Sequence, residues 1–297
     1  MPSVRVGYRR PVAELAANVV RYTGRGVTLA ADEWPAAGAP VVVLMHGGGQ
    51  TRHAWRSTGS RLAEAGYHVV SLDLRGHGDS DWASDGDYLL ARMVEDLGDV
   101  ADAVGRPVAL VGASLGGITA LVAAGTVPGL ASALVLVDIV ARIEMEGAQR
   151  IRSFMTANPD GFATLDEAAD AVALYVPERP RPRDPSGLAK NLRRRGDGRW
   201  YWHWDPAFLP AHPFEPRHSV EELEDAASRL TVPTLVVRGG LSDVVSDDGV
   251  RDFLRIVPAA EYVNVTGAGH MVAGDRNDVF SAAVVEFLGR SVPSVRG

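Results

Sequence analysis

Unbroken apolar runs of strand length constrain the fold of this chain more than any other feature of its sequence. The segment 41–45 reads Val-Val-Val-Leu-Met, so neither face of a strand built from it would be polar. Strands of this kind are typical of parallel sheets that helices cover on both faces. Other strand-like runs occupy 27–34, 68–72, 108–111, 133–137, 232–237 and 262–265.

Segments with helical periodicity lie between these runs. In 88–104 apolar residues recur at the spacing of one helix face, among them Leu90, Met93, Val94 and Leu97. Further helices are expected over 56–65, 115–124, 250–256 and 279–288. Strands that alternate with helices predict an α/β fold with a mostly parallel, doubly wound sheet. A chain of 297 residues is long enough for one large domain of this type.

The segment 139–230 interrupts the alternation. It contains amphipathic helical pieces at 148–155 and 165–175, a stretch rich in Pro and Arg at 177–185, and an aromatic stretch at 200–208. We therefore expect a core domain built from 1–138 and 231–297, with 139–230 inserted as a helical cap. A cap in this position would cover the carboxyl edge of the sheet, where ligands bind in open α/β folds.

Ser114 is the strongest candidate for a nucleophile. The sequence Gly112-Ala113-Ser114-Leu115-Gly116 follows the strand-like run 108–111 and opens the helix predicted from Leu115. Gly-x-Ser-x-Gly between a strand and a helix is typical of a serine held on a sharp turn with its hydroxyl projecting outward. The glycines leave room for the neighbouring backbone, and the amides at the helix start favour negative charge.

A glycine-rich loop that directly follows the run 41–45 is the candidate oxyanion hole. Its sequence is His46-Gly47-Gly48-Gly49, and the three glycines free the backbone to turn its N–H groups inward. We expect the Gly48 and Leu115 amides to hold the oxyanion, with Gly47 or Gly49 assisting. His46 is expected to shape this loop through hydrogen bonds rather than to take part in catalysis.

A nucleophilic serine needs a base, and the base needs an acid that orients it. Of the eight histidines, His270 follows the last predicted strand, and flanking glycines let its loop lean toward the serine. Asp243 follows the run 232–237 and is the preferred acid, because the expected chain order is Ser, then Asp, then His. Asp138, at the end of the run 133–137, is the rival for this role.

Together these motifs resemble the α/β-hydrolase superfamily, from residue 27 to residue 288 apart from the cap. The segment 73–80, Asp-Leu-Arg-Gly-His-Gly-Asp-Ser, matches it as well, and the resemblance implies a structural loop there. The set is most similar to the capped branch, which includes small esterases and lactonases, meta-cleavage-product hydrolases and non-haem haloperoxidases. Epoxide hydrolases and haloalkane dehalogenases share the architecture but use an aspartate nucleophile, so Ser114 argues against both.

Aromatic and basic residues of the insertion leave two interpretations open. Trp200, Trp202 and Trp204 would share one face if the chain is extended there, either as a wall of the substrate pocket or as an anchor for the cap. Trp55 is expected to line the entrance. The basic residues between 179 and 195 either form a solvated face or steer carboxylate-bearing substrates toward the site.

Composition excludes several other classes of function. The formal net charge is −7, which gives no general attraction for nucleic acid or anionic membranes. The chain has no cysteine, no run of about eighteen apolar residues, and no apolar signal-peptide stretch near residue 1, so we expect a cytoplasmic protein. No metal-ligand spacing or phosphate-binding glycine pattern occurs, so neither a metal nor another cofactor is expected.

The sequence therefore predicts a serine hydrolase that cleaves a small carboxylic ester or lactone through an acyl-enzyme. Two alternatives use the same three side chains, namely hydrolysis of a carbon–carbon bond next to a carbonyl and cofactor-free perhydrolysis. A third alternative is a ligand-binding member of the fold without turnover. No feature of the sequence specifies an oligomeric state.

Overall fold

The computed structural model describes residues 14–177, 181–209, 219–270 and 277–294. Its main feature is an eight-stranded sheet in the order β1-β2-β4-β3-β5-β6-β9-β10. The strands are β1 (Asn18–Thr23), β2 (Thr28–Trp34), β3 (Val41–Met45), β4 (His68–Leu72), β5 (Val108–Ala113), β6 (Ala131–Val137), β9 (Thr234–Gly239) and β10 (Glu261–Val265). Pairing is parallel from β4 to β10, while β2 runs antiparallel to both β1 and β4.

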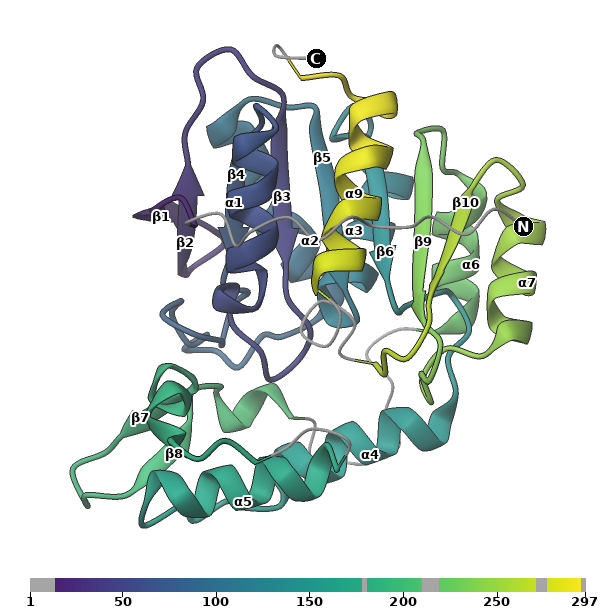
Figure 1. Ribbon diagram of the computed structural model, residues 1–297. Coiled ribbons are helices and arrows are strands. Elements are labelled where there is room, and N and C mark those ends of the chain that lie inside the picture. Colours follow the sequence, from purple (N-terminus) through teal and green to yellow (C-terminus); the bar gives the residue numbers. More distant parts are fainter. Residues whose placement is uncertain (1–13, 178–180, 210–218, 271–276, 295–297) are drawn as a thin grey trace.

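Helices cover both faces of the sheet (Figure 1). They are α1 (Arg56–Glu64), α2 (Leu90–Val104), α3 (Leu115–Thr126), α6 (Val220–Ser228), α7 (Asp247–Ile256) and α9 (Asn277–Ser291). The mostly parallel α/β fold expected from the apolar runs is thus confirmed. β1, whose residues are mostly exposed or half-buried, is a strand that the apolar pattern did not indicate.

The alternation of side chains along β3 shows why its sequence is apolar throughout. Val41, Val43 and Met45 belong to one buried cluster, which includes the inner faces of α2 and α3. Val42 and Leu44 belong to the other, which contains residues of α1 and α9. Burying each such side chain contributes roughly 1.5–3 kcal/mol, so a polar residue at either face would be costly.

A smaller unit lies across the carboxyl edge of the sheet, at the bottom of Figure 1. It contains α4 (Met145–Thr156), α5 (Leu165–Tyr175), the 3₁₀ helix η2 (Pro185–Asn191) and the hairpin of β7 (Leu192–Arg194) and β8 (Trp200–Trp202). We call these elements the cap.

Helix α6 falls within the range 139–230 that was expected to form the cap, but it packs against α3 of the core instead. A Cβ atom on Gly125 would lie only 2.1 Å from the Ala226 carbonyl oxygen, so the two helices are in close backbone contact. The part of the insertion that faces the sheet edge therefore ends before Val220.

Candidate active site

Ser114 stands on a strained turn between β5 and α3. Its φ of 45° lies in the left-handed region, which a residue with a side chain adopts at a cost of roughly 1–3 kcal/mol. The turn is held by its neighbours, since the Ser114 amide donates to the Val137 carbonyl at 3.2 Å and the Gly116 amide donates to the His46 carbonyl at 3.1 Å. The sharp turn expected from the Gly-x-Ser-x-Gly motif is present.

The glycines of this motif are required by close packing. A Cβ on Gly112 would lie 2.3 Å from the Gly116 carbonyl oxygen, and one on Gly116 would lie 2.5 Å from the Met45 carbonyl oxygen. Both distances are well inside van der Waals contact with backbone atoms, which cannot move aside independently. Any side chain at either position would displace the turn that carries Ser114.

The loop after β3 runs directly beside Ser114. A Cβ on Gly47 would be 3.3 Å from Ser114 Cβ, which places this part of the loop against the candidate nucleophile. Within the described residues the amides of Gly48 and Leu115 donate no hydrogen bond, and the first amides of a helix such as α3 have no partner inside the helix. Both remain available to an oxyanion.

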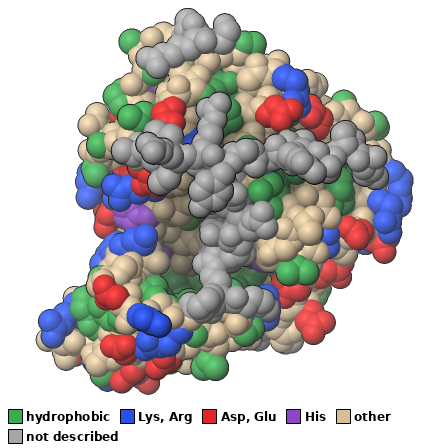
Figure 2. All heavy atoms as spheres, viewed as in Figure 1, with side chains coloured by type: hydrophobic (Ala, Val, Ile, Leu, Met, Phe, Trp, Pro, Cys, Tyr) green, Lys and Arg blue, Asp and Glu red, His purple; other side chains and the backbone are tan. Residues whose placement is uncertain are grey.

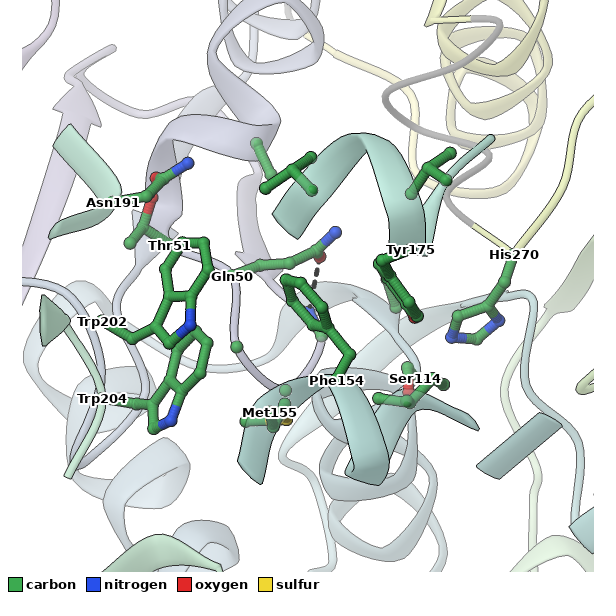
Figure 3. Close-up of a pocket in the computed structure, with 18 of the residues that line it drawn as sticks. Gln50, Thr51, Ser114, Phe154, Met155, Tyr175, Asn191, Trp202, Trp204 and His270 are labelled. Carbon is green, nitrogen blue, oxygen red and sulfur yellow. Dashed lines mark hydrogen bonds between the residues drawn. The ribbon is translucent and has the colours of Figure 1, made fainter. Parts of the chain in front are cut away.

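The sequence predicted that the Gly47 amide assists at the oxyanion, but in the structure this amide has another hydrogen-bond partner. It donates to Gln50 Oε1 at 3.0 Å, the contact drawn as a dashed line in Figure 3. The turn closes further through the Gln50 amide, which donates to the Gly47 carbonyl at 3.0 Å. Gln50 therefore occupies the Gly47 donor and rigidifies the loop, a role that the glycine pattern alone did not indicate.

His270 is held by Asp138, not by the preferred acid Asp243. Nδ1 of His270 lies 2.6 Å from Asp138 Oδ2, and Figure 3 shows the imidazole pointing toward Ser114. The Asp138 carboxylate is only 1% exposed, and it also accepts hydrogen bonds from the Gly239 amide at 2.9 Å and from Ser242 Oγ at 2.5 Å. Three donors thus fix one buried carboxylate at the end of β6.

Asp243 has another partner. Its carboxylate forms an ion pair with Arg150 of α4 at 2.9 Å, and the two side chains are 39% and 49% exposed. The sequence-based preference for Asp243 as the partner of His270 is therefore corrected. Both aspartates follow parallel strands and reach the same edge of the sheet, so position along the chain did not distinguish them.

A cavity of about 290 Å³ opens beside Ser114 and His270, between the core and the cap. Figure 2 shows the surface hollowed between these two parts, with hydrophobic side chains within the hollow. From the core the cavity is lined by Gly47, Gly48, Gly49, Gln50, Thr51, His53, Ala54, Ala113, Ser114, Val137 and His270. From the cap it is lined by Ile151, Phe154, Met155, Val172, Tyr175, Val176, Leu188, Lys190, Asn191, Trp202 and Trp204.

Stacked aromatic rings form the apolar wall of this cavity. The ring of Phe154 stacks on Tyr175 at 4.2 Å, and Trp202 stacks on Trp204 at 5.1 Å with an angle of 11° between their planes. Burial raises the pKa of Tyr175, so its phenol stays neutral near pH 7. Trp202 and Trp204 line the cavity, and both are buried.

Trp55 does not line the cavity as expected. It is 1% exposed, and its ring lies 5.7 Å from that of Phe280 in α9. The 3₁₀ helix η1 (Arg52–Trp55) leads directly into α1, and this turn sends the indole into the core between α1 and the sheet. His53 and Ala54 of the same helix line the cavity in its place.

The histidines near the oxyanion loop have structural contacts. His46 is fully buried, accepts a hydrogen bond from the Leu74 amide at 3.0 Å on Nε2, and donates from Nδ1 to the Gly47 carbonyl at 2.8 Å. Burial lowers the pKa of His46 to about 4, so the ring is neutral and links two loops. His203 of the cap acts similarly, since its Nδ1 accepts from the Gly78 amide at 2.7 Å.

The segment 73–80 is a structural loop, as the resemblance implied. Arg75 is 2% exposed and donates two hydrogen bonds to Asp96 of α2, at 2.6 and 2.8 Å. Asp73 is fully buried and accepts from the Arg52 amide at 2.6 Å. Among the described residues no group of three or more His, Cys, Asp or Glu side chains could hold a metal ion, and no helix is long and apolar enough to cross a membrane.

Comparison with known proteins shows the family to which this fold belongs. The model of the alpha/beta hydrolase family matches residues 42–283, which include the Ser114 turn, Asp138 and His270. The esterase Rv0045c of Mycobacterium tuberculosis is 30% identical over 251 residues, covering 80% of this chain and 79% of the esterase. Its crystal structure superposes with a TM-score of 0.73 at 29% identity, over 93% of this chain and 92% of that one.

A solved E-2-(acetamidomethylene)succinate hydrolase shares the fold more closely, with a TM-score of 0.81. It is 23% identical and covers 92% of this chain and 99% of its own, so it supports the architecture only. The chain described here belongs to the alpha/beta hydrolase family. It is a hydrolase.

Proposed function

We propose that this protein hydrolyses a carboxylic ester through an acyl-enzyme, with Ser114 as nucleophile, His270 as general base and Asp138 as the acid that orients the base. The contact between His270 Nδ1 and Asp138 Oδ2 carries this proposal. A proton on Nδ1 that is donated to Asp138 leaves Nε2 unprotonated, and Nε2 is the atom that must accept the proton of Ser114. The relative from Mycobacterium tuberculosis supports the ester as the bond that is cleaved.

The first half of the reaction forms the acyl-enzyme. Ser114 Oγ attacks the ester carbonyl carbon while its proton passes to His270 Nε2. The amides of Gly48 and Leu115 donate to the resulting oxyanion, and one such donor is worth about 3–4 kcal/mol in the barrier. The carbon–oxygen bond to the alcohol then breaks, and His270 returns its proton to the leaving oxygen.

The second half repeats these steps with water. His270 removes a proton from a water molecule, whose oxygen attacks the acyl carbon, and the same two amides stabilise the second oxyanion. Collapse of this intermediate breaks the bond to Ser114 Oγ, which takes the proton back from His270. A carboxylic acid leaves, and no cofactor takes part in any step.

Replacing the nucleophile tests this proposal directly. The Ser114→Ala variant should lose the hydrolysis of short p-nitrophenyl esters by about 10⁴-fold or more, with an unchanged far-UV circular dichroism spectrum. A fluorophosphonate should label the wild-type protein on Ser114, as located by peptide mass spectrometry, and should not label the variant. Full esterase activity in the folded variant, or a label on another residue, would overturn the assignment.

A further inference from the structure

The cavity beside Ser114 has a polar end as well as a catalytic end. In Figure 3 Ser114 and His270 lie at one side of the view, and Thr51 and Asn191 lie at the other. In this view the rings of Phe154 and Tyr175 and the thioether of Met155 lie between them, so a ligand that reaches from end to end would cross an apolar stretch. The polar end matters because the chemistry proposed for Ser114 gives its side chains no role.

Among the described residues that line the cavity, the side chains that can carry a charge near neutral pH are all basic. The described residues of the lining include Lys190, His53 and His270 but no Asp or Glu. His53 has a carboxylate partner outside the lining, because Asp32 Oδ2 lies 3.5 Å from its Nδ1. His270 has Asp138 as its carboxylate partner. Lys190 is left as the cation without a carboxylate partner within the part of the chain that the structure describes.

Lys190 is also the single lysine of the chain, in which the other 29 of the 30 basic residues are arginines. Several described arginines near it in sequence have partners of their own. Arg181 pairs with Asp166 and Asp170, and Arg193 pairs with Asp79. Arg195 lies over the ring of Tyr201. Arg183, Arg194 and Arg195 have no carboxylate partner among the described residues either, but Lys190 is the cation of this stretch that lines the cavity.

Asn191 supplies a second donor beside this charge. Its Oδ1 accepts a hydrogen bond from Thr51 Oγ1 at 3.4 Å, while its Nδ2 has no partner among the described residues. An ammonium and an amide N–H₂ on adjacent residues match the two oxygens of a carboxylate, which accepts hydrogen bonds and donates none. Lys190 is exposed, so the ammonium remains hydrated until a ligand arrives.

We propose that Lys190 and Asn191 form a subsite for a carboxylate at the end of the substrate remote from the ester bond. The substrate class is then an ester that carries one negative charge beyond an apolar segment. This inference rests on the proposed esterase function, since it assigns the substrate of the same site. Lys190 determines specificity in this scheme and takes no part in bond making or breaking.

Two matched series of substrates test the subsite. The first comprises p-nitrophenyl half-esters of straight-chain dicarboxylic acids from butanedioic to decanedioic acid, compared with p-nitrophenyl esters of monocarboxylic acids of equal length. The second comprises acetate esters of ω-hydroxyalkanoic acids, compared with those of simple alcohols, and places the carboxylate on the alcohol side. At one chain length the wild-type kcat/KM should favour the charged ester over its neutral match.

The Lys190→Met variant should lose this preference. Its kcat/KM for the favoured charged ester should fall about two- to five-fold, mainly through KM, as expected for one exposed ion pair. Its activity toward the neutral esters should stay unchanged. Lys190→Arg should keep most of the preference, and the control Arg194→Met, which removes a cap cation that does not line the cavity, should behave as wild type.

A binding measurement separates failure of the subsite from failure of the proposed function. Reductive ¹³C-methylation labels only Lys190 and the amino terminus and keeps the positive charge. In the Ser114→Ala variant the Lys190 methyl signal should shift on addition of the favoured half-ester and should not shift with its neutral match. A charge preference that survives in Lys190→Met, or a methyl signal that ignores the half-ester, overturns the subsite whether or not Ser114 is the nucleophile.

Discussion

Two loops at the carboxyl edge of the sheet each carry an aspartate, and the structure uses them differently. The loop after β6 buries Asp138 and directs its carboxylate at His270. The loop after β9 leaves Asp243 half exposed against Arg150 of the cap. An acid that must orient an imidazole needs burial and several fixed donors, and only the first loop provides them.

The loop after β9 has a function of its own, which is to hold the cap. A Cβ on Gly147 of α4 would lie 2.3 Å from the Asp243 carbonyl oxygen, so helix and loop are in close backbone contact. The Glu144 amide donates to the Val244 carbonyl at 2.8 Å. Arg150, which pairs with Asp243, also lies over the ring of Tyr175, with its Cζ 5.7 Å from the ring centroid. Tyr175 in turn lines the cavity.

Ser242 connects the two loops. Its hydroxyl donates to Asp138 Oδ2 at 2.5 Å, and its oxygen accepts from the amides of Val244 and Val245 at 3.2 and 3.1 Å. The loop after β9 therefore supports Asp138, the proposed acid, through a hydrogen bond. Three substitutions test this difference between the two loops.

The largest effect is expected from Asp138→Asn. The amide nitrogen of asparagine would donate to His270 Nδ1 and favour the tautomer with a proton on Nε2, which cannot accept the proton of Ser114. The proposed role predicts a fall in kcat of about 10³- to 10⁴-fold, measured with a p-nitrophenyl ester under saturating conditions. A kcat within ten-fold of wild type in the folded variant would remove Asp138 from the mechanism.

A smaller effect is expected from Ser242→Ala, which removes one donor from the Asp138 carboxylate. Hydrogen bonds to charged groups contribute about 1.5–3 kcal/mol, so kcat should fall about ten-fold or somewhat more, with little change in KM. Ser242→Thr keeps the hydroxyl and should restore most of the rate, which a merely structural defect would not allow.

The matched control for this change is Ser246→Ala. Ser246 caps α7 by accepting from the Gly249 amide at 3.1 Å and has no contact with Asp138. Loss of this cap should cost about 1 kcal/mol of stability, seen as a lower Tm, with kcat unchanged. Equal losses of kcat in the two serine variants would mean that Ser242 acts through stability alone.

The turn that carries Ser114 could be predicted from the sequence, because its pattern of glycines is local. The Gly-x-Ser-x-Gly pattern can be recognised without a structure, although only Gly112 is required by a contact inside the turn, with Gly116, while Gly116 is required by Met45 of β3. The acid is different, because Asp138 and Asp243 both follow buried parallel strands. The choice between them depends on which carboxylate the folded loops bury, and on where α4 places Arg150.

The cap was predicted as a segment, with its tryptophans as one possible pocket wall, but the part of the wall that α4 and α5 form was not predicted. Its helical periodicity over 165–175 marked α5, yet nothing in that pattern indicated that Tyr175 would stack on Phe154 and face Ser114. Trp55 was placed at the entrance for the same reason, since a tryptophan near the oxyanion loop has no local signal for the direction of its indole. These contacts arise from packing between distant segments.

The smallest effect is expected from Asp243→Asn, which tests directly whether the loop after β9 supplies the orienting acid. The ion pair with Arg150 is half exposed, and such pairs contribute about 0–1 kcal/mol, so Tm should fall by only a few degrees and kcat should stay within about three-fold of wild type. Any change should appear in KM, because Arg150 also lies over Tyr175 at the cavity. A fall in kcat as large as that expected for Asp138→Asn would transfer the role of the orienting acid to the loop after β9.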